Sequence, residues 1–391
     1  MSICWNRAGC GKTIILVREN FDAPHAWCKP GLSGYLVCLV HLVCLVLAYP
    51  VGCQMGDPML NFGMDPRGFP TTLPEFQRVF PDDAACARYL EHLRWPHGVT
   101  CMKCGKIGEP YRFAKRRSVV LRCRACQANM SLMAGTVMMG SHTPLSVWFW
   151  GAYLVATQTP GQSALQFQRQ LGLSRYETAF QMLHKLRAGM VRPERDAIGS
   201  QYPVEVDETF VGGRTKGEGY GVHHKATVVG AIEVRQRLAG ANGKTPKRAV
   251  CAGRLRLRLV PNRGAKTLTG FVQENVATGA VVRTDGWHSY DDLTKLGYSH
   301  EPVVLDDDPE RTDAHLPMIH IAFSNLKTWL LGTHHGVSHQ HLQAYLNEFV
   351  FRFNRRFYPM TAFNSALGLA AHASAPTYEM LYSGAWTHPI A

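Results

Sequence analysis

Two Cys-x-x-Cys pairs constrain the fold of this chain more than any other feature. Cys101 and Cys104 form the first pair, Cys123 and Cys126 form the second, and 18 residues separate the pairs. Each pair can turn back so that both thiolates face one metal ion, and four thiolates close a tetrahedral shell that leaves no position for water. The spacing therefore predicts a structural zinc site in a small β-ribbon, with these four cysteines as the ligands of Zn²⁺.

The segment between the two pairs is basic and aromatic. Tyr111–Arg117 and Val119–Arg122 read as two strands, and Arg124 follows them. Such a ribbon suits contact with a nucleic acid, because basic side chains bind backbone phosphates. A ribbon that only braces the fold is the alternative.

The charge of the chain points in the same direction. The 391 residues include 42 Lys plus Arg and 29 Asp plus Glu, which gives a formal net charge of +13 at pH 7. An excess of this size favours a polyanionic partner, and the length allows several domains. Basic and acidic residues balance within residues 1–66, so the whole excess lies in residues 67–391.

The first 66 residues differ from the rest of the chain. Six of the 12 cysteines fall there without a metal-binding spacing, and Tyr35–Val51 is an apolar run near the lower length limit of a membrane helix. We expect a poorly structured or spurious extension, with Met55, Met59 or Met64 as alternative translation starts. A membrane helix is the competing interpretation. The run begins too late for a cleaved signal peptide, so we expect a cytoplasmic protein without a disulfide framework or stable membrane association.

Two short helical patterns follow the ribbon. Apolar residues recur at helical spacing after Ser163, and Ser174-Arg-Tyr-Glu177 matches a capping box that would begin a second helix. The stripe predicted to face inward is Ala179, Met182, Leu183, Leu186 and Met190, which leaves Arg175, Lys185 and Arg187 outside. Residues 141–199 are therefore predicted to form a helix-turn-helix-like region whose second helix can enter a major groove. An ordinary helical hairpin is the alternative.

The chain becomes rich in β-structure after Pro203. Alternation predicts three strands, at Val204–Val211, Ala226–Ile232 and Arg254–Leu259, and the third carries Arg254, Arg256 and Arg258 in one row. Further predicted elements are a helix at Lys266–Val276, a strand at Val281–Thr284, a helix around Tyr290–Leu296, a strand around Pro302–Leu305 and a helix over His320–Leu331. This order, βββαβαβα, matches a ribonuclease-H-like fold. We therefore expect a mixed α/β protein with a ribonuclease-H-like catalytic domain.

Two aspartates hold notable positions in these strands. Asp207 lies in the first strand, and Asp285 follows the fourth strand, which lies beside the first in such a fold. Two carboxylates so near to each other cannot both stay charged without a cation. Mg²⁺ suits this position because it prefers oxygen ligands. Two Mg²⁺ ions about 4 Å apart can activate an attacking oxygen and stabilise a leaving oxygen in phosphoryl transfer. Glu208 should point to the opposite strand face, so it is not expected among the ligands. Either aspartate taken alone could instead be a turn or cap residue.

Several ordered motifs accompany these residues. They are Phe76-Gln-x-x-Phe80, Leu93-Arg-Trp-Pro96, Trp148-Phe-Trp150, Val206-Asp-Glu-Thr209, Thr284-Asp-Gly286, Asn325-Leu-Lys-Thr-Trp329, Gly332-Thr-x-x-Gly-Val-Ser338 and Phe351-Arg-Phe-Asn-Arg-Arg356. Together with the cysteine pairs, they resemble the bacterial insertion-sequence transposases of the ISXO type, which have a zinc ribbon before a DDE-type catalytic domain. The resemblance extends from about Phe69 to about Leu369.

The resemblance implies a DNA transposase. Such an enzyme recognises the terminal inverted repeats of its insertion sequence, cleaves there and joins the freed 3′-hydroxyl to target DNA with Mg²⁺. Asp207 and Asp285 look like the first two catalytic metal ligands. The third ligand is usually Glu, but the matching position here is Asn325, whose neutral amide can bind Mg²⁺ without adding charge. The implied partners are double-stranded DNA, as element ends and as target, and further copies of the chain in a homo-oligomer on that DNA.

Two competing functions remain open at this point. One is a DNA-binding regulator without catalysis, and the other is a structure-specific nuclease that cleaves without joining. The roles of two residues are open as well. Lys327 could contact a phosphate or be solvated, and His320 could hydrogen-bond a ligand or be structural. The last helix is expected to pack its apolar stripe in the core and to place the basic run Arg352–Arg356 over DNA, and a helix dedicated to a partner is the alternative.

The predicted domain organisation follows from these patterns. Residues 1–66 form the extension, 67–140 a helical lead-in with the zinc ribbon, and 141–199 the helix-turn-helix-like region. Residues 200–340 form the ribonuclease-H-like DDE/N catalytic domain, and 341–391 the C-terminal helix and tail.

Overall fold

The protein is described here from a computed structural model. The structure describes residues 70, 72–115, 118–192, 196–212, 225–237, 249–303, 315–373, 376–383 and 385–389. The chain divides into two units, residues 1–60 and 61–391, and every described residue belongs to the second. The predictions for residues 1–66 therefore lie outside the described residues. Within the described part, no helix is long and apolar enough to cross a membrane.

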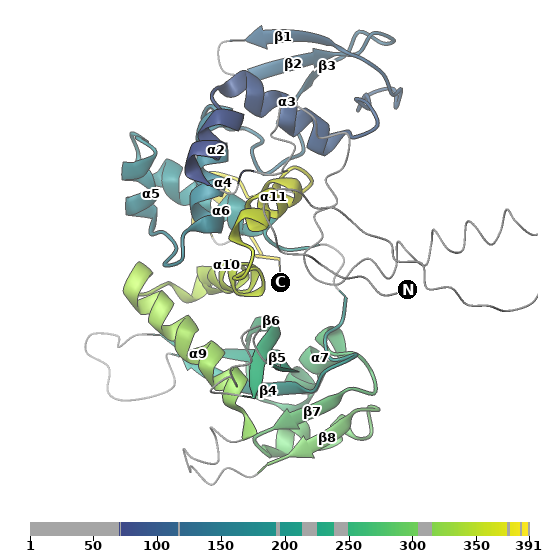
Figure 1. Cartoon of the computed structure of the whole chain (residues 1–391), viewed down its shortest axis with the longest axis vertical. Helices are drawn as coiled ribbons and strands as arrows, with labels where there is room; N and C mark the ends of the chain where they lie inside the picture. Colours follow the sequence, from purple (N-terminus) through teal and green to yellow (C-terminus); the bar gives the residue numbers. More distant parts are fainter. Residues whose placement is uncertain are drawn as a thin grey trace, which may run out of the picture. The chain divides into compact units, whose positions relative to one another are not determined.

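A pair of helices and a small sheet begin the described chain (Figure 1). The elements are α2 (Leu73–Val79), α3 (Asp83–Arg94), β1 (Tyr111–Lys115), β2 (Ser118–Arg122) and β3 (Asn129–Ser131). Thr72 and Asp82 cap the two helices, because their side chains accept hydrogen bonds from backbone amides of the first turn. The three strands form an antiparallel sheet in the order β1-β2-β3. The predicted two-stranded ribbon is confirmed, and β3 adds a strand that the sequence patterns did not indicate.

A helical layer follows the ribbon. Its members are α4 (Leu145–Thr157), α5 (Ala164–Gln170), α6 (Tyr176–Gly189) and α11 (Pro359–Ala370). The apolar helix α4 contacts α3, α6 and α11. Phe76, Phe80, Phe149 and Phe363 form an aromatic cluster there, with ring centroids 4.3 to 6.4 Å from their aromatic neighbours. The helices of residues 141–199 therefore pack into a core that also includes α11 from near the C-terminus.

The second helix of the predicted hairpin differs from expectation. It begins at Tyr176 with Arg175 as the N-cap, and no side chain caps it, so the predicted capping box at Ser174 is wrong. The prediction that Lys185 and Arg187 lie outside is also wrong, because both side chains are buried. The exposed residues of α6 therefore lie in its first turn.

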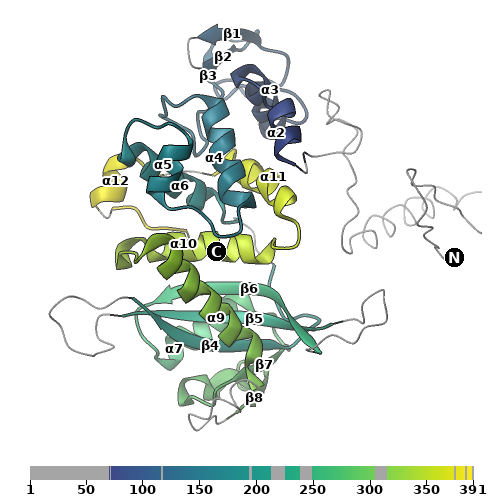
Figure 2. The same cartoon turned by 60° about the vertical axis from the view of Figure 1, so that its left-hand side comes forward.

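A five-stranded mixed sheet forms the next layer (Figure 2). Its strands are β4 (Val204–Val211), β5 (Ala226–Gln236), β6 (Val250–Val260), β7 (Val281–Thr284) and β8 (Ser299–Pro302). The spatial order is β6-β5-β4-β7-β8. β4, β5 and β6 pair antiparallel, whereas β4 pairs parallel with β7 and β7 with β8. The predicted neighbourhood of the first and fourth strands is confirmed.

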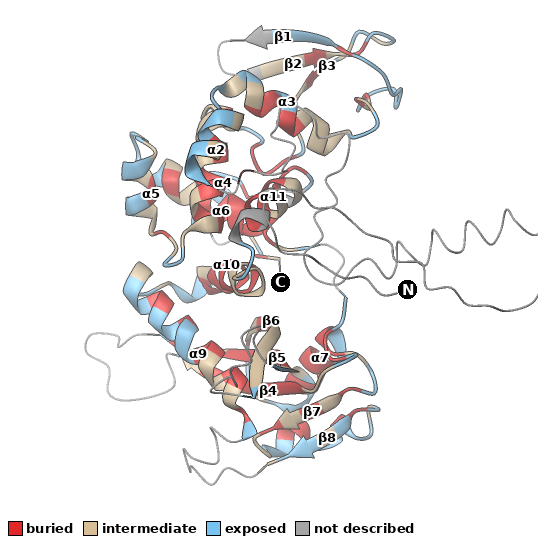
Figure 3. Cartoon of the chain, viewed as in Figure 1, coloured by how far each residue is buried: buried red, intermediate tan, exposed pale blue. Residues whose placement is uncertain are grey.

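Helices cover both faces of this sheet, and a separate hydrophobic core fills each side (Figure 3). α7 (Ala265–Asn275) and the 3₁₀-helix η2 (His288–Leu293) pack on one face, where Phe271 and Tyr290 are buried. α9 (Pro317–Trp329) and α10 (Leu342–Asn354) pack on the other face, where Phe323 and Leu346 are buried. The 3₁₀-helix η2 replaces the α-helix predicted at 290–296. β8 begins three residues before the predicted strand and overlaps it at Pro302. The short helix α12 (Tyr378–Ser383) precedes the end of the chain.

Candidate active site and zinc site

Three carboxyl groups meet beside the end of β7. One oxygen each from Asp207, Glu208 and Asp285 lies within 4.8 Å of the other two. Asp207 and Glu208 belong to β4 and are buried, whereas Asp285 follows β7 and is half-buried. The structure therefore brings together the two aspartates that the sequence singled out.

The register of the parallel β4–β7 pair explains this meeting. Glu205 lies opposite Arg283, so the same register continued by two residues sets Asp207 beside Asp285. β7 has already ended there, and Gly286, with φ 76°, lies in the left-handed region that favours glycine. The hydrogen-bonded ladder is therefore open at this point, and side chains from both faces of β4 can reach Asp285.

The electrostatics of the group favour a cation. Burial, followed by the carboxylates of Glu208 and Asp285, raises the pKa of Asp207 to about 8. Carboxylates at this separation repel one another when ionised, and a divalent cation removes the repulsion. Oxygen ligands of this kind fit a hard ion such as Mg²⁺. The donor set therefore suits the metal that the sequence predicted.

Glu208 joins this group although it leaves β4 on the opposite face. That alternation is confirmed, because Asp207 faces α9 while Glu208 faces Tyr290 of η2. The exclusion of Glu208 from the metal ligands stays a prediction, although its carboxylate lies in the same group. Its carboxylate accepts a hydrogen bond of 2.7 Å from the Tyr290 hydroxyl and pairs with the Arg263 guanidinium. With both oxygens engaged, Glu208 anchors the site to the α7 side of the sheet.

Arg263 and Tyr290 had no predicted role in the site. Arg263 lies in the loop between β6 and α7, and its guanidinium also stacks over the Trp287 ring, 4.6 Å from the centroid. Tyr290 is fully buried, five residues after Asp285. In the sequence, Arg263 is the one basic residue in the loop between β6 and α7. A single basic residue in a loop does not by itself predict a part in the site.

The first turn of α9 contacts the site from the other face. The buried carboxylate of Glu205 accepts hydrogen bonds from the backbone amides of Met318 (2.7 Å) and Ile319 (2.8 Å), where a helix N-terminus favours an anion. Nε2 of His320 lies 3.4 Å from Oδ2 of Asp207. Glu205 therefore holds the start of α9 so that His320 contacts Asp207.

Asn325 and Lys327 lie further along α9 and are exposed. Five residues separate Asn325 from His320, which corresponds to about 140° around the helix axis. Asn325 thus projects from a different side of α9 than the residue that meets Asp207. The ligand role of Asn325 and the phosphate contact of Lys327 stay predictions.

Two arginines of the row on β6 form ion pairs. On β6, Arg254 pairs with Glu233 and Asp196, and Arg258 pairs with Glu274. The row on β6 is therefore not an open basic face, because carboxylates from other segments neutralise it.

Arginines at the basic end of α10 also contact other parts of the protein. Arg352 donates hydrogen bonds to the backbone carbonyls of Gln158 and Thr159, and Arg356 donates to the carbonyl of Ala252. Burial lowers the pKa of Arg355, which stacks on a phenylalanine ring, to about 10. Arg352 and Arg356 thus also have a structural role, and the placement of Arg352–Arg356 over DNA stays a prediction.

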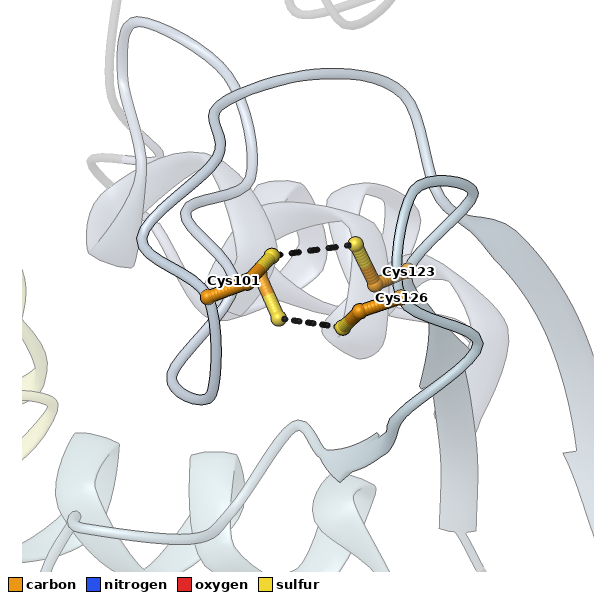
Figure 4. Close-up of side chains that lie close together, drawn as sticks. Cys101, Cys123 and Cys126 are labelled. Carbon is orange, nitrogen blue, oxygen red and sulfur yellow. Dashed lines mark hydrogen bonds between the residues drawn. The ribbon is translucent and has the colours of Figure 1, made fainter.

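The four predicted zinc ligands form one cluster (Figure 4). Sγ of Cys101 lies 3.6 Å from Sγ of Cys126, and Sγ of Cys104 lies 3.8 Å from Sγ of Cys123. All four thiols are free, with none in a disulfide. Backbone hydrogen bonds from Cys104 and Lys103 lower the pKa of Cys101 to about 6, which favours the thiolate that binds a metal. Four sulfur ligands without an open position fit a structural zinc ion.

Two matching turns build the cluster. The amide of Gly105 donates to the carbonyl of Cys101 (2.8 Å), and the amide of Gln127 donates to the carbonyl of Cys123 (3.0 Å). Both residues that follow a pair have positive φ, 70° for Gly105 and 61° for Gln127. The side chain of Gln127 donates to the carbonyl of Arg124 (3.0 Å), which helps a non-glycine residue keep this conformation. The sequence spacing thus corresponds to two zinc knuckles of the same geometry.

Comparison with protein families agrees with both sites. The family model described as ISXO2-like transposase domain matches residues 199–354, which include Asp207, Asp285 and Asn325. The model described as transposase zinc-ribbon domain matches residues 81–129, which include all four cysteines. The chain belongs to the ISXO2-like transposases. The two matches stand in the expected order and together cover just over half of the transposase chain.

No curated protein and no solved structure gave a match to this transposase. The helical layer at residues 141–189 lies between the two matched segments, and α11 and α12 lie beyond them. The carboxylate group and the cysteine cluster are thus in the matched segments, whereas the helices that connect them are described by the structure alone.

Proposed function

We propose that this protein binds the terminal inverted repeats of an insertion sequence and catalyses Mg²⁺-dependent DNA cleavage and strand transfer. The observation that carries the proposal is the meeting of Asp207 and Asp285 at the open end of β7, inside the ISXO2-like domain. A protein that only binds DNA gains nothing from two carboxyl groups that repel each other. The strand order further supports assigning this domain to the ribonuclease-H-like class.

Each residue of the site has a distinct task in this proposal. Asp207 and Asp285 would hold Mg²⁺, which supplies charge neutralisation at the phosphate and activation of an oxygen nucleophile when bound. Glu208, fixed by Arg263 and Tyr290, keeps β4 in position beside the end of β7. His320 contacts Asp207 and orients its carboxylate.

Asn325 is proposed as the third ligand. Its exposed amide lies on the same helix as His320, which contacts Asp207. Substituting His320 and Asn325 separately shows which of the two supports catalysis.

The DNA partner is expected on surfaces where basic groups remain exposed. On the ribbon these are Lys103, Lys106 and Arg124, and around the start of α6 they are Arg169 and Arg175. The ribbon and the first turn of α6 would read the terminal repeats, and a homo-oligomer would hold two ends together. Since the cysteine cluster requires free thiols, we place this activity in a reducing cytoplasm.

A strand-transfer assay tests the proposal. Purified full-length protein is incubated with labelled DNA that carries the element's own ends, with supercoiled target DNA and Mg²⁺. Asp207→Asn and Asp285→Asn should each lower joining by at least about 100-fold while end binding persists, because they remove charge where the phosphate reacts. Glu301→Gln, which removes an exposed carboxylate paired with Arg283, is the matched control and should retain activity.

Three outcomes would refute parts of the proposal. Cleaved ends without joined products would indicate a nuclease. End-specific binding without cleavage in Mg²⁺ or Mn²⁺ would indicate a regulator. Full activity in either aspartate variant would remove the carboxylate pair from the mechanism.

A further inference from the structure

Three histidines from distant parts of the chain meet away from the carboxylate site. His184 lies on α6, His341 directly precedes α10, and His388 lies in the C-terminal tail. One ring nitrogen from each lies within 4.8 Å of the other two. The ring centroid of His184 is 4.8 Å from that of His341 and 5.5 Å from that of His388.

Four of the six ring nitrogens in this cluster are buried without a hydrogen-bond partner among the described residues. His184 is fully buried, and neither Nδ1 nor Nε2 has a partner among the described residues. Nδ1 of His341 and Nδ1 of His388 are also buried without a partner in the described part of the chain. An imidazole carries one donor and one acceptor, and a buried polar atom without a partner costs roughly 1 to 3 kcal/mol. Several such nitrogens close together indicate a site for a metal ion, which would accept their lone pairs.

The surroundings hold the three rings neutral. Burial, followed by the charge of Arg187, lowers the pKa of His184 far below its usual value. Burial has the same effect on His341, and it lowers the pKa of His388 to about 4. The rings are therefore unprotonated at neutral pH, and this is the form of histidine that binds a metal ion.

The charged groups around the cluster are paired with each other. Arg187 forms a buried ion pair of 2.8 Å with Glu348 and stacks over the Tyr345 ring. Arg352 lies 3.5 Å from the same carboxylate, and the His334 ring contacts the Tyr345 ring. The excess positive charge opposes a bound cation. Without a carboxylate or thiolate ligand in the cluster, the site should bind more weakly than four cysteines do.

We propose that His184, His341 and His388 form a second zinc site. Three imidazole nitrogens with a water molecule in the fourth position satisfy the tetrahedral preference of Zn²⁺. Zn–N bonds of about 2.0 to 2.1 Å require nitrogens about 3.3 Å apart, so the nitrogens have to approach by at most about 1.5 Å. His388 is buried and lies in an irregular segment after α12.

The bound ion would join three parts of the protein. α6 belongs to the helical layer next to the zinc ribbon, α10 covers the catalytic sheet, and the tail ends the described chain. Zinc in this position ties the tail to both helices, in addition to the hydrogen bond from Asn347 to the carbonyl of Pro389 (2.6 Å). The site would hold these segments together, and it does not depend on the transposase activity proposed above.

Zinc stoichiometry tests the proposal. Full-length protein without a histidine tag is loaded with Zn²⁺ in excess Mg²⁺, desalted, and analysed by mass spectrometry for metal per chain. The wild type should hold two zinc ions, and His388→Gln should hold one. His339→Gln, which alters an exposed histidine two residues before His341, is the matched control and should hold two. His388 lies in the tail, so its substitution leaves the folded layers in place even if His184→Gln does not fold.

Cobalt spectra and proteolysis provide independent readouts. Cobalt at the cysteines gives a thiolate charge-transfer band, whereas cobalt at the histidines adds only weak visible bands, and those bands should disappear in His388→Gln. Zinc should also slow cleavage of the tail by protease at least tenfold in the wild type and not in the variant. One zinc per chain in the wild type, or two in His388→Gln, would overturn the proposal and leave the cluster as a packed set of neutral rings.

Discussion

Glu233 offers the clearest test of how the catalytic sheet is held together. Its carboxylate is 1% exposed and receives two guanidinium groups, from Arg254 and Arg235, each at 2.8 Å. Backbone amides of Gly199 and Arg254 donate to it as well, at 3.2 Å. Burial alone would raise the pKa of Glu233, but the hydrogen bonds from the arginines outweigh it and lower the pKa from 4.5 to about 2.

This shift sets the expected cost of Glu233→Gln. A folded pKa about 2.5 units below the unfolded value corresponds to roughly 3 kcal/mol at pH 7. Because the folded pKa is depressed, the contribution is fully present above pH 4.5 and is lost as pH falls towards 2. At pH 3 it should have dropped to roughly 1 kcal/mol.

Urea unfolding followed by tryptophan fluorescence measures this difference. Trp287 and Trp329 lie in segments that pack on the same sheet, so they report on its unfolding. Glu301→Gln removes an exposed partner of Arg283 and is the control, with an expected loss below about 1 kcal/mol at every pH. A loss in Glu233→Gln that stays below 1 kcal/mol at pH 7, or that does not shrink towards pH 3, would refute the assignment of Glu233 as the buried anchor.

Three further predictions follow from the structure. Arg187→Met should destabilise the protein by about 3 to 5 kcal/mol, because it leaves the buried carboxylate of Glu348 with a weaker partner. Arg283→Met, which removes an exposed ion pair, is the control. Similar urea midpoints for the two variants would contradict the importance of the buried pair. Gly105→Ala should weaken zinc retention in a chelator competition, since alanine costs about 1 kcal/mol at a φ of 70°, whereas Gly108→Ala, which has open space and no positive φ, should match the wild type. Lys103→Gln should reduce the steepness of the salt dependence of DNA binding, measured as the slope of log K for DNA binding against log salt concentration, by about 1. An equal reduction in Arg258→Gln would show that the arginines of β6 do reach DNA.

Much of the catalytic sheet was predictable from local patterns. The bounds of β4 and β7 agree with the predicted strands, because each is a short alternating or apolar run that ends at a polar or glycine-containing turn. The approach of Asp207 to Asp285 was predictable because strand order fixes which ends are neighbours. The cysteine cluster was predictable from spacing alone, since both halves are local turns.

One failure comes from pairing between residues far apart in the sequence. Arg187 was assigned to the outside of α6 because it falls off the apolar stripe, but its partner Glu348 lies 161 residues later. The start of α6 shows a local failure: Ser174 fits a capping box, yet the helix begins two residues later without a side-chain cap.

Two separate hydrophobic cores, one on each face of the sheet, position the carboxylates of the site. Asp207 is set by α9 and the core around Phe323, while Glu208 is set by Arg263, Tyr290 and the core around Phe271. A loosening of either core therefore displaces one carboxylate relative to the other. Mutational tolerance should accordingly be low on both faces of the sheet, and second-site suppressors of a core mutation should lie in the same core as the mutation that they rescue.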